Sequence, residues 1–392
     1  MQRTIVTLLV FISASVQAQN VPRSVYADST LGWVKVYQYK GAKKPIQIDH
    51  HYYSIPQLSI CDSLINWIQL SYTPVAGLGD ARVVVNEKLS PYNQGTASMP
   101  HSYGAYAKVY LDLKRGVNGK LTIYDNSAYY WNIRVNGNIG DEIQLISTPE
   151  QYYFYIPAFD QSYNDPEFQL KAKQSLDLSN NPSIKNYIWY FQPSGINIWH
   201  RMVVILARNN QLPYVQVTKG EYIDQMSAAI DRKYVEEKEE AMKSWSEGQA
   251  RSKALEAAEA RYQKRKSIIV DQKEKYKARL QEKTSIFTSQ PSAFVEQYGD
   301  LFEGNDPEHA RKIPVYKYDP SMMELCKTDH PQWITINWDI IPTYDIDGSK
   351  NNYSYTAMKY MHESILNHFN FDFVYQFFFD PEKVKGKQYK PR

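Results

Sequence analysis

Hydrophobic and polar positions alternate along much of residues 31–218, which predicts a β-rich region. Residues 108–113, Lys-Val-Tyr-Leu-Asp-Leu, would place their apolar side chains on one face of a strand. Similar short runs, including residues 67–72, are rich in Val, Ile, Tyr and Trp and are bounded by turn-forming residues. Many short strands favour a β-sandwich or jelly roll. The alternative is two smaller β units divided near residues 157–181.

The pattern changes at Thr218, where a long helical segment is predicted to begin. Thr218 and Glu221 have the spacing of a capping box, in which each side chain accepts a hydrogen bond from the other residue's backbone N–H. Residues 221–283 contain no Pro and a single Gly, and 26 of the 54 residues from 231 to 284 are charged. A continuous helix of that length would reach about 80 Å. A helical hairpin is the alternative.

The apolar positions of this segment form only one narrow stripe. One row at seven-residue spacing is mostly apolar, and its members are Tyr234, Ala241, Gly248, Leu255, Tyr262, Ile269 and Tyr276. The companion row contains charged residues, whereas a two-stranded coiled coil needs both rows to be apolar. We therefore expect a largely solvated helix, with self-association through it as the less favoured alternative.

The last hundred residues or so predict a small α+β unit. Strands are expected at residues 313–318, 333–341 and 371–379, with a helix at 355–369. The fold class is therefore α+β. A β-sandwich or jelly-roll-like N-terminal region is followed by a long charged helix or helical hairpin and by a small C-terminal α+β unit.

The N-terminus predicts export. A short basic start precedes an apolar run at residues 4–16, and Val16 and Ala18 supply the small residues expected before a signal-peptide cleavage site. That run is shorter than the roughly 20 residues that span a bilayer. We expect a periplasmic, cell-surface or secreted protein whose mature chain has no transmembrane segment.

Four units follow from these patterns. They are a signal peptide at residues 1–18, a β-rich domain at 19–218, a charged helical segment at 219–290 and a small α+β domain at 291–392.

Composition narrows the class of protein. The 392 residues include 33 Tyr, 14 Phe and 8 Trp, so the chain is too aromatic to be disordered. A net charge of +3 does not indicate the concentrated basic surface that nucleic-acid binding needs. Cys61 and Cys326 are too few for a disulfide framework, and two buried thiols are favoured over a bridge.

Catalytic and metal-binding motifs are not found. His362-Glu363 begins like a zinc-protease helix, but position 366, where the second His would stand, is Leu. There is no nucleophile elbow and no phosphate-binding loop. We expect no metal and no cofactor, and we assign no catalytic residue. The sequence does not test whether two carboxylates from distant strands form a glycosidase pair. The acidic residues in aromatic surroundings are Asp125, Asp160, Asp165, Asp339 and Asp372, and the sequence ranks none of them.

Dense aromatic clusters are the strongest functional signal. The candidate ligand-binding residues are Tyr129, Tyr130, Trp131, Tyr152, Tyr153 and Tyr155. Rings at consecutive strand positions face both sides of a sheet, so about half of each cluster should point away from the core. Exposed Tyr and Trp rings stack on sugars or pack on proteins. The alternative is that tyrosine is simply a preferred strand residue.

Two segments resemble uncharacterised secreted proteins of Bacteroidota-type bacteria. They are residues 212–222, Leu-Pro-Tyr-Val-Gln-Val-Thr-Lys-Gly-Glu-Tyr, and the tail from Phe371-Asp372-Phe373 to Pro381-Glu382-Lys383-Val384. The Val-Gln-Ala-Gln signal ending and the Tyr- and Asn-rich composition add to this resemblance. It implies a bacterial envelope setting and carries no activity or site residue.

The function that these observations favour is non-catalytic. We expect an exported, tyrosine-rich envelope protein that binds a glycan, a peptide or a partner protein through aromatic surface of the β-rich region. One alternative is a secreted glycosidase-like hydrolase, and another is a structural assembly subunit that uses the long helix.

Overall fold

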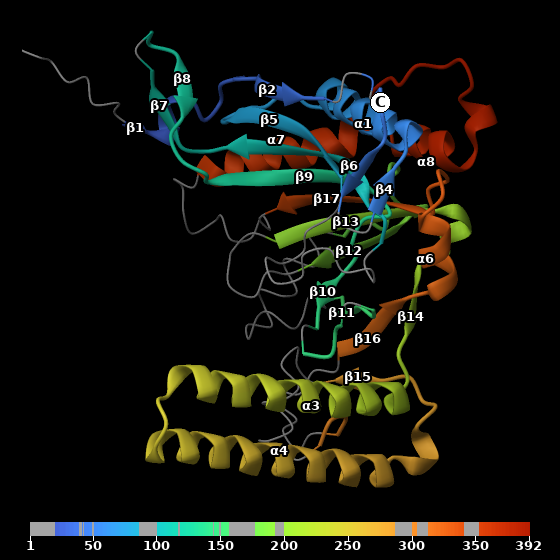
Figure 1. The fold of residues 1–392 in the computed structure, drawn as a ribbon. Coiled ribbons are helices and arrows are strands. Elements are labelled where there is room, and N and C mark those ends of the chain that lie inside the picture. The colour runs from blue at the N-terminus through green and yellow to red at the C-terminus, as the bar shows by residue number, and fades with distance from the viewer. Residues whose placement is uncertain are drawn as a thin grey trace, which may run out of the picture.

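A computed structural model describes most of the chain. The described residues are 20–38, 41, 43–48, 51–85, 100–116, 118–143, 145–148, 150–156, 177–192, 200–286, 300–303, 313–340 and 353–392. The expected signal peptide at residues 1–18 lies outside them. The α+β fold class is confirmed, with sheets, a helical hairpin, and further strands and helices toward the C-terminus (Figure 1).

A seven-stranded sheet forms the upper body in Figure 1, in the order β12-β13-β17-β9-β6-β5-β2. Its strands are β2 (Trp33–Tyr37), β5 (Leu78–Val85), β6 (Tyr103–Tyr110), β9 (Ala128–Val135), β12 (Ile188–Gln192), β13 (His200–Ala207) and β17 (Trp333–Ile340). All neighbours are antiparallel except β2 and β5. Strand β17, from the last part of the chain, lies between β9 and β13.

Three helices cover one face of this sheet. They are α1 (Ile55–Ser71), α7 (Tyr353–His368) and α8 (Phe371–Phe379), which lie behind the strands in Figure 1. Alternate residues of the strands, such as Trp131 and Trp338, point toward them and are fully buried in the main core. The helices therefore cover an apolar face of the sheet.

A second sheet packs below the first. It has the order β10-β11-β16-β14, and β15 also pairs with β16. The strands are β10 (Asp141–Glu142), β11 (Tyr153–Tyr155), β14 (Tyr214–Gln216), β15 (Ser285–Ile286) and β16 (Ile313–Tyr318). Phe154 and Tyr318 of this sheet share a core with Val203 and Ile205 of β13, so the two sheets are joined through the β13 side.

Smaller elements complete the described chain. Strands β1 (Asn20–Val21), β7 (Leu113–Arg115) and β8 (Leu121–Ile123) form one small sheet, and β3 (Ile46–Ile48) pairs with β4 (His51–Tyr53). Helix α6 (Pro320–Cys326) precedes β17. Short 3-10 helices lie at Arg23–Val25, Arg208–Asn210, Lys277–Arg279 and Pro381–Lys383.

The long charged segment is a helical hairpin of α3 (Lys219–Ser244) and α4 (Gln249–Lys275). It breaks at Gly248, whose φ of 136° is a conformation that few other residues adopt. The rings of Tyr234 and Tyr262 stack with centroids 4.4 Å apart. Residues of the predicted apolar row therefore contact each other between the two helices of one chain.

The start of α3 has one of the two hydrogen bonds of the expected capping box. The Thr218 hydroxyl accepts a hydrogen bond from the Glu221 backbone N–H at 3.2 Å. The Glu221 carboxylate instead accepts from the Tyr153 hydroxyl at 3.0 Å and from the Lys317 ammonium at 2.7 Å. Tertiary partners on β11 and β16 thus replace the backbone partner, and they tie the hairpin to the second sheet.

Two strand predictions are wrong. Residues 67–72 lie at the end of α1, and residues 371–379 form α8. In α1 the Ser54 hydroxyl and the Gln57 side chain make a reciprocal capping box. In α8 the Asn370 side chain accepts from the Phe373 backbone N–H at 2.9 Å. These caps satisfy the first free N–H groups of each helix and favour helical over extended backbone.

Within the described ranges, no helix is long and apolar enough to cross a membrane.

Candidate functional site: the polar face of the large sheet

The face of the seven-stranded sheet that points away from α1, α7 and α8 carries polar residues in two cross-strand rows. We call this surface the polar face. The first row contains Arg201, Asp339, Tyr130, Lys108, Asp80 and Lys35, and the second contains Asn337, Asn132, Tyr106, Arg82 and Tyr37. Because side chains alternate along strands while neighbours in register point the same way, these residues from six strands share one surface.

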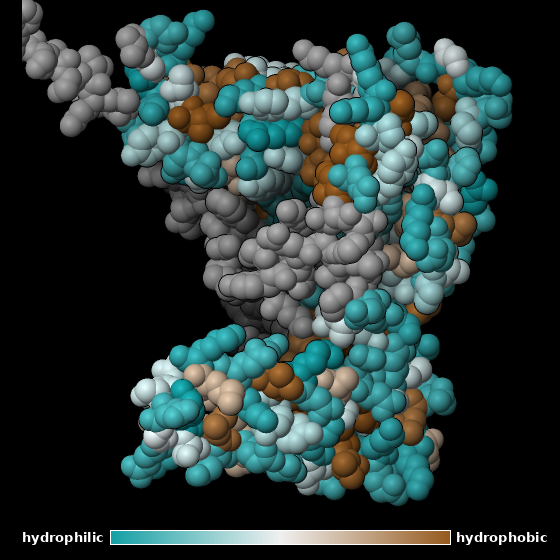
Figure 2. Space-filling view, viewed as in Figure 1, coloured by the Kyte–Doolittle hydropathy of each residue, from teal (hydrophilic) through white to brown (hydrophobic). Residues whose placement is uncertain are grey.

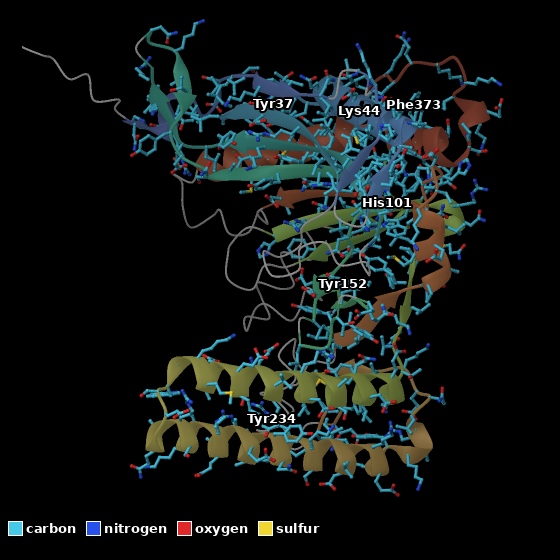
Figure 3. The ribbon with its side chains drawn as sticks, viewed as in Figure 1. Tyr37, Lys44, His101, Tyr152, Tyr234 and Phe373 are labelled. Atoms are coloured by element: carbon cyan, nitrogen blue, oxygen red, sulfur yellow. The ribbon has the colours of Figure 1, made fainter. Side chains whose placement is uncertain are left out.

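Figures 2 and 3 look onto this side of the molecule. Hydrophilic colour lies over the upper part of the molecule in Figure 2, between hydrophobic patches. Tyr37 is labelled on β2 in Figure 3, and its ring is 48% exposed. The polar face is therefore partly open to solvent at its β2 end.

Asp339 anchors the opposite end of the first row. Its carboxylate accepts a hydrogen bond from the Tyr130 backbone N–H at 2.9 Å, and Arg201 Nε lies 3.6 Å away. Burial raises the pKa of Asp339, while the charge of Arg201 opposes that shift. The carboxyl group thus combines a fixed position with a raised pKa.

Further polar contacts order the second row. Asn132 Nδ2 donates to Asn337 Oδ1 at 2.8 Å. The guanidinium of Arg82 donates from Nη2 to Asp80 Oδ2 at 2.6 Å and lies 4.8 Å from the centre of the Tyr37 ring. Asp80 and Asn337 are buried, whereas Arg82 and Asn132 are partly exposed. The accessible donors and acceptors here are therefore those of Arg82 and Asn132.

Lys108 lies near the middle of the polar face among tyrosine rings. Its ammonium is 5.1 Å from the Tyr130 ring centre and 5.9 Å from that of Tyr110. The rings of Tyr106 and Tyr130 have centroids 6.4 Å apart. Both contacts to the ammonium are within the range of a cation–π interaction.

The six aromatic candidates lie in different places. Tyr129 and Trp131 are fully buried in the main core, whereas Tyr130 between them lies on the polar face. Tyr152, which precedes β11, and Tyr153, within β11, are both buried. Tyr155 of β11 is half-buried and packs against the core that the second sheet shares with the helical hairpin. The structure therefore does not bring the two clusters together on one surface.

Sequence reasoning missed Tyr106, Lys108 and Arg82 as members of this surface. Their strands alternate apolar and polar residues, and that alternation is the available signal. It marks which residues share a face within a strand. The order of strands across the sheet, which brings the rows together, is not encoded in that local pattern.

The carboxylates of the polar face do not form a glycosidase pair. Asp80 on β5 and Asp339 on β17 are separated by three strand spacings, or about 14 Å. Glycosidase carboxyl groups are about 5–9.5 Å apart. Of the other acids singled out above, Asp372 accepts from the Tyr187 hydroxyl at 2.6 Å, and Asp160 and Asp165 lie outside the described residues.

A cavity of about 330 Å³ lies between α6, α8 and the end of β13. Leu325 and Phe378 contribute apolar surface, and Arg208 and His330 contribute polar groups. Arg208 Nη2 donates to the Phe379 carbonyl at 3.4 Å. Its volume suits a small ligand, but it has fewer ordered polar groups than the polar face.

The buried thiols and imidazoles give no metal site in the described part of the chain, where no group of three His, Cys, Asp or Glu side chains is placed to hold an ion. His51 and His101 stack with ring centroids 5.0 Å apart. Cys61 and Cys326 are buried and free. Burial raises the pKa of Cys61 to about 12, which disfavours a reactive thiolate.

Known proteins do not identify the site. The chain matches no protein-family model, and no curated protein or solved structure matches it.

Proposed function

We propose that this protein is an exported glycan-binding protein that holds a saccharide chain against the polar face. The observation that carries the proposal is the pair of in-register rows, which combine tyrosine rings with carboxylate, amide and basic side chains on one sheet surface. The N-terminal pattern, which predicts export, supports it because extracellular polysaccharide is then an accessible ligand.

Tyrosine rings and polar groups suit the two kinds of surface that a sugar presents. A pyranose ring has an apolar C–H face that packs on the flat ring of Tyr106 or Tyr130, and hydroxyl groups at its rim. Asn132 and Asn337 can both donate and accept hydrogen bonds. Tyr itself combines an apolar body with a polar tip, so both chemistries are available within one row.

The size of the surface favours a chain over a single sugar. The first row runs from β13 to β2 across five strand spacings, or about 24 Å. A segment of polymer can contact several positions along such a row, and each contact adds to the binding free energy without requiring a deep pocket.

Affinity electrophoresis of the purified protein in gels that contain neutral or acidic polysaccharides tests the proposal. We expect retardation by at least one polymer, and at least a tenfold loss of affinity in the Tyr106→Ala/Tyr130→Ala double variant, which is about 1.4 kcal/mol. Tyr37→Ala tests the same face through a 48% exposed ring whose loss does not disturb the core.

Tyr124→Ala is the matched control. Tyr124 follows β8, is 49% exposed and lies near Lys114, but it belongs to the small sheet. Its removal should leave affinity unchanged. The proposal is wrong if no polysaccharide retards the protein, or if the folded Tyr37→Ala and double variants bind as tightly as the unchanged chain.

A further inference from the structure

The polar face carries more positive than negative charge. Its two rows contain four basic side chains, Lys35, Arg82, Lys108 and Arg201, and two acidic ones, Asp80 and Asp339. Both carboxylates have local basic partners, since Asp80 pairs with Arg82 and Asp339 lies beside Arg201. The two acids are therefore engaged, and the two rows carry two more basic than acidic side chains.

Lys108 is the basic residue with the clearest need for an anion. Its backbone position is opposite Asp80 in the register of β5 and β6, but Asp80 directs its carboxylate to Arg82. Among the described residues, no acidic side chain forms an ion pair with Lys108, and the half-buried ammonium instead lies against Tyr130 and Tyr110. Partial removal of a charge from water without a counter-ion is unfavourable.

We infer that the glycan is acidic and that a carboxylate on one of its sugar rings pairs with the Lys108 ammonium between the tyrosine rings. This inference rests on the proposed function and names the class of its ligand. A uronic acid has the required arrangement, because its carboxylate extends from the edge of a pyranose whose C–H face can pack on Tyr130. The ion pair supplies an anionic partner for Lys108, and it strengthens in the partly desolvated site.

Pairs of polymers that differ only in their carboxylates separate the effect of charge on binding from the effect of the sugar. Hyaluronate, alginate and polygalacturonate are each compared with their carboxyl-reduced forms, which keep the glycan chain and lose the charge. We expect at least one acidic polymer to bind at least tenfold more tightly than its neutral form. Lys108→Gln should remove that preference, and Lys108→Arg, which keeps the charge, should restore most of it.

Lys114→Gln is the matched control, because Lys114 lies 6.0 Å from the Tyr124 ring, on the small sheet. It should leave the preference for acidic polymers unchanged. Binding of neutral polymers with no preference for the acidic forms would overturn the acidic-ligand inference and leave the proposed function standing. Absence of binding to every neutral and acidic polymer would overturn both.

Discussion

Gly104 of β6 shows how closely the strands of the large sheet approach each other beside the polar face. A Cβ atom at this position would lie 2.1 Å from the Ile133 carbonyl oxygen and 3.0 Å from the Arg134 Cα. Both atoms belong to the backbone of β9, so they cannot move without displacing the strand that carries Tyr130. A side chain is excluded here for reasons of space.

The first prediction is that Gly104→Ala destabilises the protein. The methyl group must push β6 away from β9, and overpacking of this kind costs about 1–3 kcal/mol. Urea unfolding followed by circular dichroism measures the change.

Gly116→Ala is its matched control, because the nearest atom to an added Cβ there is 3.4 Å away. The control should change the free energy of unfolding by less than about 0.5 kcal/mol. Equal stability of the two variants would contradict the close approach of β6 and β9.

Tyr129, Tyr130 and Trp131 show how much of a side chain's orientation can be predicted from the sequence of one strand. Alternation along a strand predicts that the middle ring faces the opposite side from its neighbours. It does not say which side meets the helices. That choice follows from the packing of α1 and α7 against Tyr129 and Trp131, which leaves Tyr130 on the polar face.

Element identity was predictable where charged residues dominate and ambiguous where apolar and aromatic residues dominate. Residues 371–379 are rich in Phe, which favours strands, yet they form α8. A short apolar run does not by itself distinguish a strand from a buried helix. Here Trp67 of α1 contacts the rings of Phe373 and Phe377, one helical turn apart, so packing against α1 selects the helix.

Glu237 is the clearest ionic link between the two helices of the hairpin. Its carboxylate accepts from Arg261 at 2.9 Å and from Arg265 at 3.2 Å, and its side chain is only 14% exposed. Ala241 and Ala258 are the buried apolar residues of the distal half, among the described side chains. Polar contacts therefore contribute much of the cohesion between α3 and α4 there.

The second prediction concerns this link. Glu237→Gln removes the charge that joins two arginines, and we expect a local loss of about 1–2 kcal/mol, because charge-assisted hydrogen bonds exceed exposed ion pairs in strength. Amide hydrogen exchange of the distal half of α3 and α4 measures the local opening free energy.

Glu239→Gln serves as the control for the hairpin. Glu239 is 63% exposed and lies 3.7 Å from Lys243 of the same helix, so it joins no second helix. Its loss should alter the opening free energy by less than about 0.5 kcal/mol. If both variants exchange alike, Glu237 does not hold the hairpin together.

Three histidines link the stability of the whole molecule to pH. Burial lowers the pKa of His101, His200 and His362 to about 4, against about 6.5 in an unfolded chain. His51 also lowers the pKa of His101. His362 Nδ1 accepts a hydrogen bond from Trp338 Nε1 at 2.9 Å, which requires that nitrogen to be unprotonated. The native state therefore resists protonation at all three sites.

The third prediction is that stability falls as the pH decreases from 7 to 5. Below about pH 6.5 the unfolded chain binds protons that the native state does not bind, so the free energy of unfolding decreases by up to about 2 kcal/mol per histidine. Carboxylates whose pKa lies near or below 4 in both states contribute little in this window. Asp339, whose pKa burial raises in the native state, opposes the decrease. Urea unfolding at several pH values provides the measurement.

His362→Gln tests the origin of that pH dependence. Gln keeps an acceptor for Trp338 but does not titrate, so the decrease between pH 7 and 5 should be smaller than in the unchanged chain. A free energy of unfolding that is constant or higher at pH 5 would contradict the prediction.

The sequence by itself determined the α+β class, the strand alternation and the charged helical segment, because these depend on periodicity, capping and composition within short stretches of chain. Only the tertiary structure decided the order of strands, which places β17 between β9 and β13 and lines up Arg201, Asp339, Tyr130 and Lys108. That order depends on contacts between residues far apart in the chain. Local alternation specifies two faces for each strand, and packing of helices on one of them leaves the other as the polar face.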